Sequence, residues 1–597
     1  MILKALYDYY ERQKEYMPSM HMALIYFKYA ILIDIDGNFK GLEPLGNEDG
    51  LPILTFRPEE RTSAPVAHCM GDNGSYILGL KDVEKDSLLD LEKEFKKNST
   101  NYETFKKDIE EIYNSLPQNK YAQAVRAFYQ KYTINTILQI CKDKYWSDLS
   151  KSLTKNITFR ILGEDEVAAA DIEIINYKIS GVTNQNEESI CLITGNKSKP
   201  VNTTYSTFIL GGKSNAKLVA FQINSGYDSY GKKMGLNAPM SEEAEFKYTT
   251  ALLTLLSKKS KNKFLVGNRT FVFWASNNNE VGKQAEESIW NMFGFDNSNE
   301  DNPNRGIEQV RKVFKSIYSG SLKTSLDDKF YILGLAPNSA RISVTYWAEV
   351  PLMDFAERIN NHFDNMEIVD NECKYPKPYM GLHSILSSVT LDGKISGKDP
   401  KLTPNLPEAV IKSIFQGLPY PYTLYSACLR RIRAEQQVPK EIKERIKWVD
   451  AMVCRAAIIK AYLNRLNNNE QKIEVMLDKE NKNQGYLCGR LFAVLDRIQE
   501  KAKEQRSIRE RYMNSASATP AMIFPTILNL SRHHEKKLES EVEKIWFEKL
   551  EQEILKKISA NGFPAQLDLQ DQGRFFVGYY HQRQDFFEKK TTNDENE

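Results

Sequence analysis

The sequence has few of the features that mark secreted, disulfide-bonded or membrane-embedded proteins. Its seven cysteines are odd in number and scattered over 597 residues without a CxxC pair, so neither a disulfide framework nor a zinc module is expected. No apolar run approaches the roughly 18 residues that span a bilayer, and the opening residues, MILKALYDYYERQKE, lack the apolar core of a signal peptide. We therefore expect a cytoplasmic protein without a membrane partner.

The chain also lacks an excess of charge of either sign. Lysine and arginine number 81 against 79 aspartate and glutamate residues, which gives a formal net charge of +2. A protein coated in nucleic acid normally has a strongly basic domain, so any contact with nucleic acid must be local. The 41% hydrophobic and 27% charged content suits packed globular domains, and the length predicts about three to five of them.

Local signatures of catalysis and of cofactor binding are missing as well. The seven histidines lie far apart except for His533 and His534, whose helix positions point in different directions, and RHHEKKLE lacks the HExxH spacing of a zinc site. The GGKSN string at residues 211–215 is similar to a phosphate-binding loop, but Thr207 stands where that loop needs its first glycine. We predict no catalytic residue, no metal and no cofactor, although carboxylates from distant segments can still converge.

The hydrophobic pattern changes near residue 400. Before it, helical patterns alternate with apolar runs typical of strands, at residues 157–162, 189–194, 218–223, 271–275, 331–335 and 341–347. After it, strand signals nearly vanish and three stripes at helical spacing remain: Ile442, Ile446, Val449, Val453 and Ala456; Leu487, Leu491, Leu495, Ile498 and Ala502; Leu538, Val542, Ile545 and Trp546. The sequence predicts an α+β protein, with a mixed N-terminal lobe of β-sheets and helices over 1–400, divisible near 150, and a helical bundle over 401–597.

Residues 218–256 place a polar loop between a predicted strand and a predicted helix. The loop contains Gly226, Ser229, Tyr230, Gly231, Lys232, Lys233, Gly235 and Asn237. Its glycines allow sharp turns, and its other side chains supply hydrogen-bond donors, an aromatic ring and two cations. Ser241 is a suitable N-cap for the helix, because Glu242 and Glu243 follow in the first turn. Such a loop is either an ordinary solvated turn or a surface that holds phosphates.

A second polar loop lies within residues 57–80. It contains Arg61, Thr62, Asp72, Asn73 and Gly74. Asparagine and glycine accept a positive φ, and aspartate bonds to its own backbone, so Asp72, Asn73 and Gly74 by themselves predict only a turn.

Positive charge gathers at two further places. The segment from Ser257 to Arg269 has no acidic residue and contains Lys258, Lys259, Lys261 and Lys263. It is either a solvated connection or a site of phosphate attraction, for which affinity would fall with salt. In the bundle, Arg430, Arg431 and Arg433 cover more than one face of a predicted helix. At least one of them is expected to be structural, paired with Glu435 or with a partner subunit.

Several strings of this sequence resemble one known family. SYGKKMGLNAPMSEEAEFKYTTAL, at residues 229–252, resembles the central signature of the large subunit of the type I-C CRISPR Cascade complex, an RNA-guided DNA surveillance assembly. The RTS stretch with the following DN turn and YILG is similar to the N-terminal region of that subunit. In the same order follow FYILGLAPNSARISVTYW, ACLRRIRAEQ, YLCGRLFAVLDRIQ, SASATPAMIFP and QGRFFVGYYHQRQDFF. The resemblance therefore covers both ends and the middle of the chain.

The resemblance implies a non-catalytic subunit that recognises the protospacer-adjacent motif in target double-stranded DNA. It would help to open the duplex, stabilise the R-loop and support recruitment of the helicase-nuclease. The residues expected at the adjacent motif are Arg61, Thr62, Asn73 and Gly74. The residues expected to hold the nucleic-acid backbone are Ser229, Tyr230, Lys232, Lys233, Asn237, Lys259, Lys261, Arg430, Arg431 and Arg433.

The partners that the resemblance implies are guide RNA, target DNA, the helicase-nuclease, and the backbone, guide-processing and small subunits of Cascade. Met476 is a candidate internal start for a separately translated small subunit. The alternative function is a metal-dependent nuclease or a guide-RNA processing enzyme.

Overall fold

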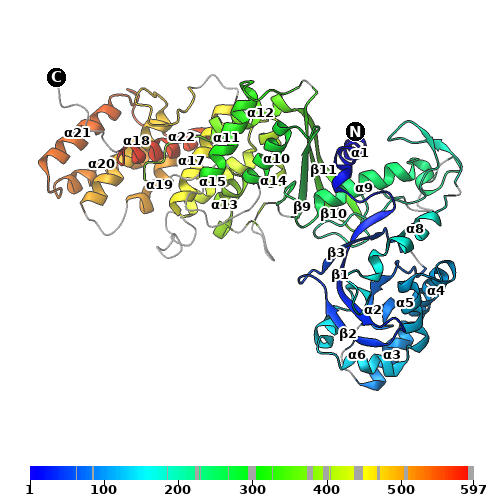
Figure 1. The fold of residues 1–597 in the computed structure, drawn as a ribbon. Coiled ribbons are helices and arrows are strands. Elements are labelled where there is room, and N and C mark those ends of the chain that lie inside the picture. Colours follow the sequence, from blue (N-terminus) through cyan, green and yellow to red (C-terminus); the bar gives the residue numbers. More distant parts are fainter. Residues whose placement is uncertain are drawn as a thin grey trace. The chain divides into compact units, whose positions relative to one another are not determined.

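The chain forms two compact units. The structure, a computed structural model, describes residues 1–61, 64–81, 83, 87–184, 186–221, 228, 230–266, 268–293, 304–325, 327–372, 381–393, 395, 402–403, 405–435, 448–466, 471–502 and 508–588. The first unit comprises Met1–Ser257 and Asn338–Ile342, and the second comprises Lys258–Pro337 and Ser343–Glu597. Figure 1 follows the chain through both.

The first unit mixes strands and helices along the chain. Its strands are β1 (Met22–Ile33), β2 (Phe39–Pro44), β3 (Leu51–Phe56), β4 (Gly71–Asn73), β5 (Asn156–Ile161), β6 (Ser189–Ile190) and β7 (Lys197–Ser198). Its helices are α1 (Ile2–Gln13), α2 (Gly74–Ile77), α3 (Leu88–Lys97), α4 (Ser99–Ser115), α5 (Lys120–Lys131), α6 (Ile134–Cys141), α7 (Trp146–Leu149), α8 (Ile172–Ser180) and α9 (Glu242–Leu256).

A five-stranded sheet organises the first unit. Its strand order is β2-β1-β5-β4, and β3 pairs with the N-terminal half of β1. β1 and β5 run parallel, with Tyr29 opposite Ile157, whereas β4 pairs antiparallel with β5, with Asn73 opposite Asn156. Because β4 ends the strand order, this register places Asn73 at an edge of the sheet.

Helices α4 and α5 provide the main core of this unit. α5 packs on β1 and β5, and α4 packs on α5. The ring of Phe128 meets the ring of Phe159 edge to face, with centroids 5.4 Å apart, and both side chains are buried together with Phe105. Burying an aromatic side chain of this kind stabilises the fold by roughly 2–3 kcal/mol. The sheet is thus a rigid platform for the loops that leave β3 and enter β4.

The second unit begins with a sheet and continues as helices. Its strands are β8 (Lys263–Val266), β9 (Arg269–Ala275), β10 (Lys329–Asn338) and β11 (Arg341–Pro351), in the order β11-β10-β9-β8. Its helices are α10 (Glu280–Phe293), α11 (Asn304–Tyr318), α12 (Leu352–Met366), α13 (Leu382–Val389), α14 (Leu406–Phe415), α15 (Tyr422–Ala434), α17 (Trp448–Arg465), α18 (Gln484–Lys501), α19 (Ile508–Ala518), α20 (Pro520–Glu535), α21 (Glu541–Leu555) and α22 (Leu569–Asp585).

One continuous apolar core runs from this sheet into the C-terminal helices. At its start, the ring of Phe330 stacks on Phe355 of α12 at 4.7 Å between centroids. At its far end, α18 and α22 lie in close contact, because a Cβ on Gly489 would fall 1.9 Å from the carbonyl oxygen of Phe575. Only glycine permits that approach of two helix backbones.

The predicted α+β class is confirmed, with mixed sheets and helices first and helices toward the C-terminus. The helix predicted after Ser241 is also confirmed, and the side chain of Ser241 caps it. The predicted boundary near residue 400 falls inside the second unit, and the division near 150 falls inside the first. A separate domain over residues 401–597 stays a prediction.

Several elements differ from the sequence-based expectation. The strand predicted over 189–194 is shortened to Ser189–Ile190. Residues 218–221 form no strand, and 222–223 lie outside the described residues. The carbonyl of Val219 accepts a hydrogen bond from the hydroxyl of Thr204, so side chains take up backbone groups that a strand ladder would use.

The third predicted stripe belongs to the core only at Leu538, which is buried. Val542, Ile545 and Trp546 of α21 are exposed, whereas Phe547, Leu550 and Ile554 of the same helix are buried. In the first stripe, Ile442 and Ile446 lie outside the described residues, and Val453 and Ala456 are buried as expected.

Candidate nucleic-acid interface

The basic loop before α9 presents an aromatic ring and two lysines to solvent. Tyr230 is 99% exposed and has a φ of +51°, and Gly231 follows with a φ of +74°. Lys232 and Lys233 are exposed, and their side chains have no ion pair or hydrogen bond with the residues that the structure describes. Ser229 lies outside the described residues. Two uncompensated cations beside a ring suit the phosphates and bases of nucleic acid.

Asn237 stabilises this loop through hydrogen bonds from its side chain. Its side-chain amide donates to the carbonyls of Met234 (3.1 Å) and Lys232 (3.3 Å) and to the carboxylate of Asp228 (3.2 Å). Its donors are therefore engaged within the loop. The geometry gives Asn237 a supporting role, and direct contact with nucleic acid stays a prediction.

Gly235 anchors the same loop to the segment 201–202. Its N–H donates to the carbonyl of Asn202 at 2.9 Å. A Cβ at this position would lie 2.1 Å from the carbonyl oxygen of Val201, so only glycine fits. The exposed tip of the loop is thus held on a tightly packed base.

Asn73 lies where β4 passes into α2. Its side-chain oxygen accepts from the N–H of Ser75 (3.0 Å) and from the hydroxyl of Ser75 (2.6 Å), which caps the short helix. Its amide NH₂ makes no hydrogen bond within the described part of the chain. A half-buried asparagine with a fixed oxygen and unused donors can offer those donors to base acceptors.

Arg61 and Gly74, predicted beside Asn73, occupy structural positions. The guanidinium of Arg61 pairs with the carboxylate of Asp72, donates to the carbonyl of Val66 at 2.8 Å and covers the ring of Tyr76 at 4.0 Å. Gly74 is buried, and its N–H already donates to the carbonyl of Leu153 at 2.7 Å.

Both residues hold the turn that presents Asn73, and a DNA contact of either one stays a prediction. Thr62 lies outside the described residues.

The lysines and arginines predicted in the second unit differ in accessibility. Lys259 and Lys261 are exposed between α9 and β8, and Arg430 is exposed on α15; none of these three side chains has a partner among the described residues. Arg431 instead donates to Glu435 at 2.9 Å, which confirms the expected structural pairing. Arg433 donates to Gln572, and burial lowers its pKa.

The predicted residues therefore gather in separate groups. One loop carries Tyr230, Lys232, Lys233 and Asn237. Arg61 lies in the loop before β4, and Asn73 and Gly74 lie where β4 passes into α2; all of these residues belong to the first unit. Lys259, Lys261 and the three arginines belong to the second unit.

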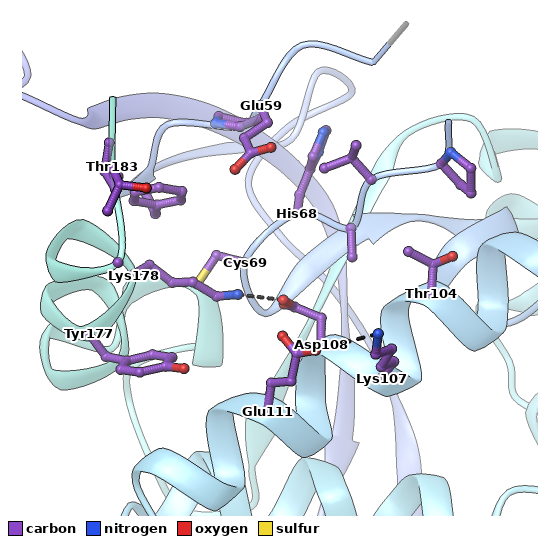
Figure 2. Close-up of a pocket in the computed structure, with 17 residues that line it drawn as sticks. Glu59, His68, Cys69, Thr104, Lys107, Asp108, Glu111, Tyr177, Lys178 and Thr183 are labelled. Atoms are coloured by element: carbon purple, nitrogen blue, oxygen red, sulfur yellow. Dashed lines mark hydrogen bonds and ion pairs between the residues drawn. The ribbon is translucent and has the colours of Figure 1, made fainter. Parts of the chain in front are cut away.

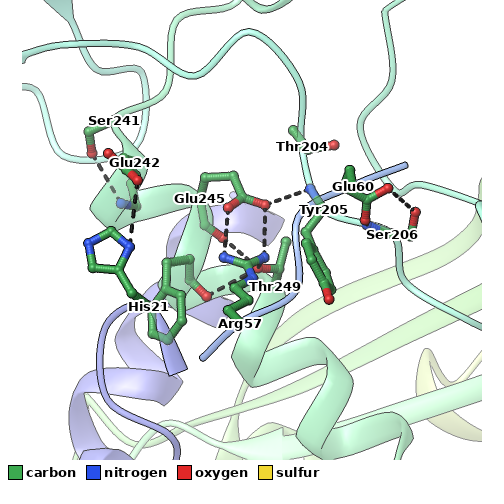
Figure 3. A network of polar contacts seen from close by, with 12 residues as sticks. His21, Arg57, Glu60, Thr204, Tyr205, Ser206, Ser241, Glu242, Glu245 and Thr249 are labelled. Carbon is green, nitrogen blue, oxygen red and sulfur yellow. Dashed lines mark hydrogen bonds and ion pairs between the residues drawn. The ribbon is translucent and has the colours of Figure 1, made fainter. Parts of the chain in front are cut away.

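A buried polar network in the first unit was not predicted from the sequence. Arg57 donates to the carboxylate of Glu245 at 3.1 and 3.4 Å and to the hydroxyl of Thr249 at 3.0 Å. Its guanidinium covers the ring of Tyr205 at 3.9 Å. Figure 3 shows these side chains converging on the carboxylate of Glu245. The acidic first turn of α9 was visible in the sequence, but its partner lies 188 residues away.

A cavity of about 600 Å³ opens beside the loop after β3. Figure 2 shows Lys178 pointing at Asp108 across it, with Glu59 and Glu111 nearby. Burial raises the pKa of Asp108, and Lys178 opposes that rise. Burial also raises the pKa of the Cys69 thiol to about 12, so the thiol stays protonated. Three carboxylates against two lysines make this cavity unfavourable for a phosphate group.

The residues that the structure describes also bear on two other functional classes. No group of three His, Cys, Asp or Glu side chains among them could hold a metal ion. Likewise, no described helix is both long and apolar enough to cross a membrane.

Comparison with known families decides the identity. Residues 6–587 match the family described as CRISPR-associated protein (Cas_Csd1). The chain belongs to this family. It is accordingly a CRISPR-associated Cascade subunit, and the resemblance to the type I-C large subunit is confirmed. A search of curated proteins gives no match to the chain.

Proposed function

We propose that this Cascade subunit is non-catalytic and recognises the protospacer-adjacent motif in target double-stranded DNA with its first unit. In an RNA-guided complex, base pairing reads the sequence, so the protein needs only a short duplex motif and backbone contacts. This division of recognition between guide RNA and protein fits a chain with a net charge of +2 and local basic loops. It would also help to open the duplex, stabilise the R-loop and support recruitment of the helicase-nuclease.

The observation that carries the proposal is the pair Lys232 and Lys233 on a braced loop. Both lysines are exposed and unpaired within the described residues, and the Asn237 amide and Gly235 hold the loop in shape. Loop backbone that is already held by hydrogen bonds loses less conformational freedom on binding, which favours a hold on phosphates by its cations.

Motif recognition is assigned to Asn73. Its free amide donors can meet minor-groove acceptors, which distinguish A·T from G·C pairs only in part and so give a relaxed preference. Asn73 ends the edge strand β4 and is only partly buried.

The experiment uses the assembled complex with guide RNA and a labelled target duplex. The double variant Lys232→Glu/Lys233→Glu should weaken binding and reduce the slope of log affinity against log salt by about 2, since each phosphate contact contributes about 0.9. The matched control is Lys96→Glu/Lys97→Glu, which makes the same charge change at two exposed positions of α3. Equal binding of the loop variant and the wild type at every salt concentration would remove the loop from the interface.

The alternative function has its own test. The purified chain is incubated with precursor guide RNA or with duplex DNA, with and without a divalent metal. We expect no cleavage; cleavage by the chain alone would favour a nuclease or a guide-RNA processing enzyme.

A further inference from the structure

The loop that precedes Asn73 is fixed at its start by buried charges. Arg57 follows β3 directly and is held by Glu245 of α9, whose side chain is only 6% exposed. Three residues later, the carboxylate of Glu60 accepts from the N–H of Ser206 (2.5 Å) and from its hydroxyl (2.7 Å). Arg61 then pairs with Asp72, next to Asn73. Arg57 and Glu60, at the start of this loop, are therefore held by residues that lie far away in the sequence.

The segment 201–206 connects that loop to the basic loop. At one end, Asn202 accepts from the N–H of Gly235, the base of the basic loop. At the other end, the N–H of Tyr205 donates to Glu245 at 2.7 Å. Glu245 thus holds both Arg57 and Tyr205 with one carboxylate. A shift of this carboxylate would therefore move the loop that leads to Asn73 relative to the loop that carries Lys232 and Lys233.

Glu245 is too deeply buried to touch DNA itself. Burial also makes its charge costly unless each oxygen is paired, and the two hydrogen bonds from Arg57 and the one from Tyr205 supply those partners. A charge placed in this way favours one geometry of its partners over neighbouring ones.

We propose that Glu245 is a positioning residue for discrimination of the adjacent motif. It acts through Arg57 and Tyr205, which fix the frame in which Asn73 meets the duplex while Lys232 and Lys233 hold its backbone. The inference rests on the proposed function and adds a determinant of specificity that makes no contact with nucleic acid.

The test measures the affinity of the assembled complex for duplexes with a preferred and with a disfavoured adjacent motif. Glu245→Gln keeps the shape but removes the charge opposite Arg57. Glu245→Asp and Arg57→Lys keep the charges but break the two-point contact, and they decide the matter if Glu245→Gln does not assemble. The matched control is Glu243→Gln, on the same helix, because Glu243 is 59% exposed.

The ratio of the two affinities should fall about tenfold in the Glu245 and Arg57 variants, the order expected for one lost base contact, and stay at the wild-type value in Glu243→Gln. A purely structural role would lower the melting temperature and leave this ratio unchanged, and that result in an assembled complex would overturn the proposal.

Asn73→Ser separates this failure from failure of the proposed function, since serine also caps helices but lacks the amide. If Asn73→Ser alters the ratio and the Glu245 variants do not, only the positioning role is wrong. If neither alters it, the first unit does not read the motif.

Discussion

Arg455 of α17, only 1% exposed, donates to the carboxylate of Glu435 at 2.5 Å. Arg431 of α15 bonds the other oxygen of the same carboxylate, and Arg455 also donates to the carbonyl of Ser388 at 2.7 Å. One buried carboxylate thus joins two helices. Arg431 is therefore engaged in an internal ion pair, and Arg430 is the exposed cation of α15.

Glu435→Gln is expected to destabilise the second unit by about 3 kcal/mol, because it leaves a buried arginine without a counterion. Hydrogen exchange of α15 and α17 during urea titration measures this loss. Arg430→Gln, on the same helix but exposed, should change stability by no more than about 0.5 kcal/mol. Equal stability of the two variants would show that the carboxylate does not hold the helices together.

The pairing of Arg431 with Glu435 could be predicted from the sequence, because residues four apart share one face of a helix. The cap at Ser241 could be predicted for a similarly local reason. The contact of Arg57 with Glu245 could not, since nothing local relates residues so far apart. The two apolar faces of α21 could not be told apart from the sequence either, because tertiary contacts decide which one is buried. The face with Val542 is exposed, and the face with Phe547 is buried.

In the candidate site, too, local features could be predicted from the sequence and contacts between distant segments could not. Glycine spacing and lysines predicted an accessible basic loop, and exposure of Lys232 and Lys233 agrees. The resemblance implies both Gly74 and Asn73 at the adjacent motif, but only the fold shows that Gly74 is packed inside the turn. Burial and partner choice depend on segments brought together by the sheet, which periodicity does not record.

Gly235→Ala should destabilise the first unit by about 1–3 kcal/mol, because the new methyl group overlaps the carbonyl of Val201 and must push the backbone aside. Thermal and urea unfolding measure the loss. Gly181→Ala is the control: its Cβ would have only ordinary contacts, the nearest at 3.5 Å. If alanine at 235 is as well tolerated as alanine at 181, the tight base of the basic loop is not needed.

Because His68 is largely buried, we expect the first unit to lose stability in mild acid. Burial lowers its pKa from 6.5 to about 4; Asp72 opposes this shift and Arg61 adds to it. The unfolded chain therefore binds a proton more readily than the folded chain. The stabilising effect is complete above the unfolded pKa of 6.5, declines as the pH falls through the window from 6.5 to 4, and does not change further below it.

Between pH 7 and pH 5 this one group should cost the first unit about 2 kcal/mol. His68→Gln cannot take up the proton and should show a smaller loss over the same range, measured by thermal unfolding at both pH values. His533→Gln, which changes an exposed histidine of α20, should keep the wild-type dependence. A loss that is identical in His68→Gln and wild type would assign the pH dependence to other groups.

Met476 is the candidate internal start, and it lies just before α18. The product from this residue would contain α18 to α22, with the close contact of Gly489 and Phe575 intact. It would lack α17, whose Ile459 lies 3.1 Å from the position of a Cβ on Gly573. The short product would therefore expose apolar surface of α22 and is expected to be recovered with the other Cascade subunits rather than alone.

Met476→Leu, written with a leucine codon that cannot start translation, should abolish the short product and leave the full chain folded, because Met476 is 62% exposed. A C-terminal tag and an immunoblot of cells that express the gene report both products. Met522→Leu is the matched control, since Met522 is 74% exposed and lies within the same helices. Both products should persist in the control. An undiminished short product in Met476→Leu would place its origin elsewhere, in another start or in proteolysis of the exposed segment.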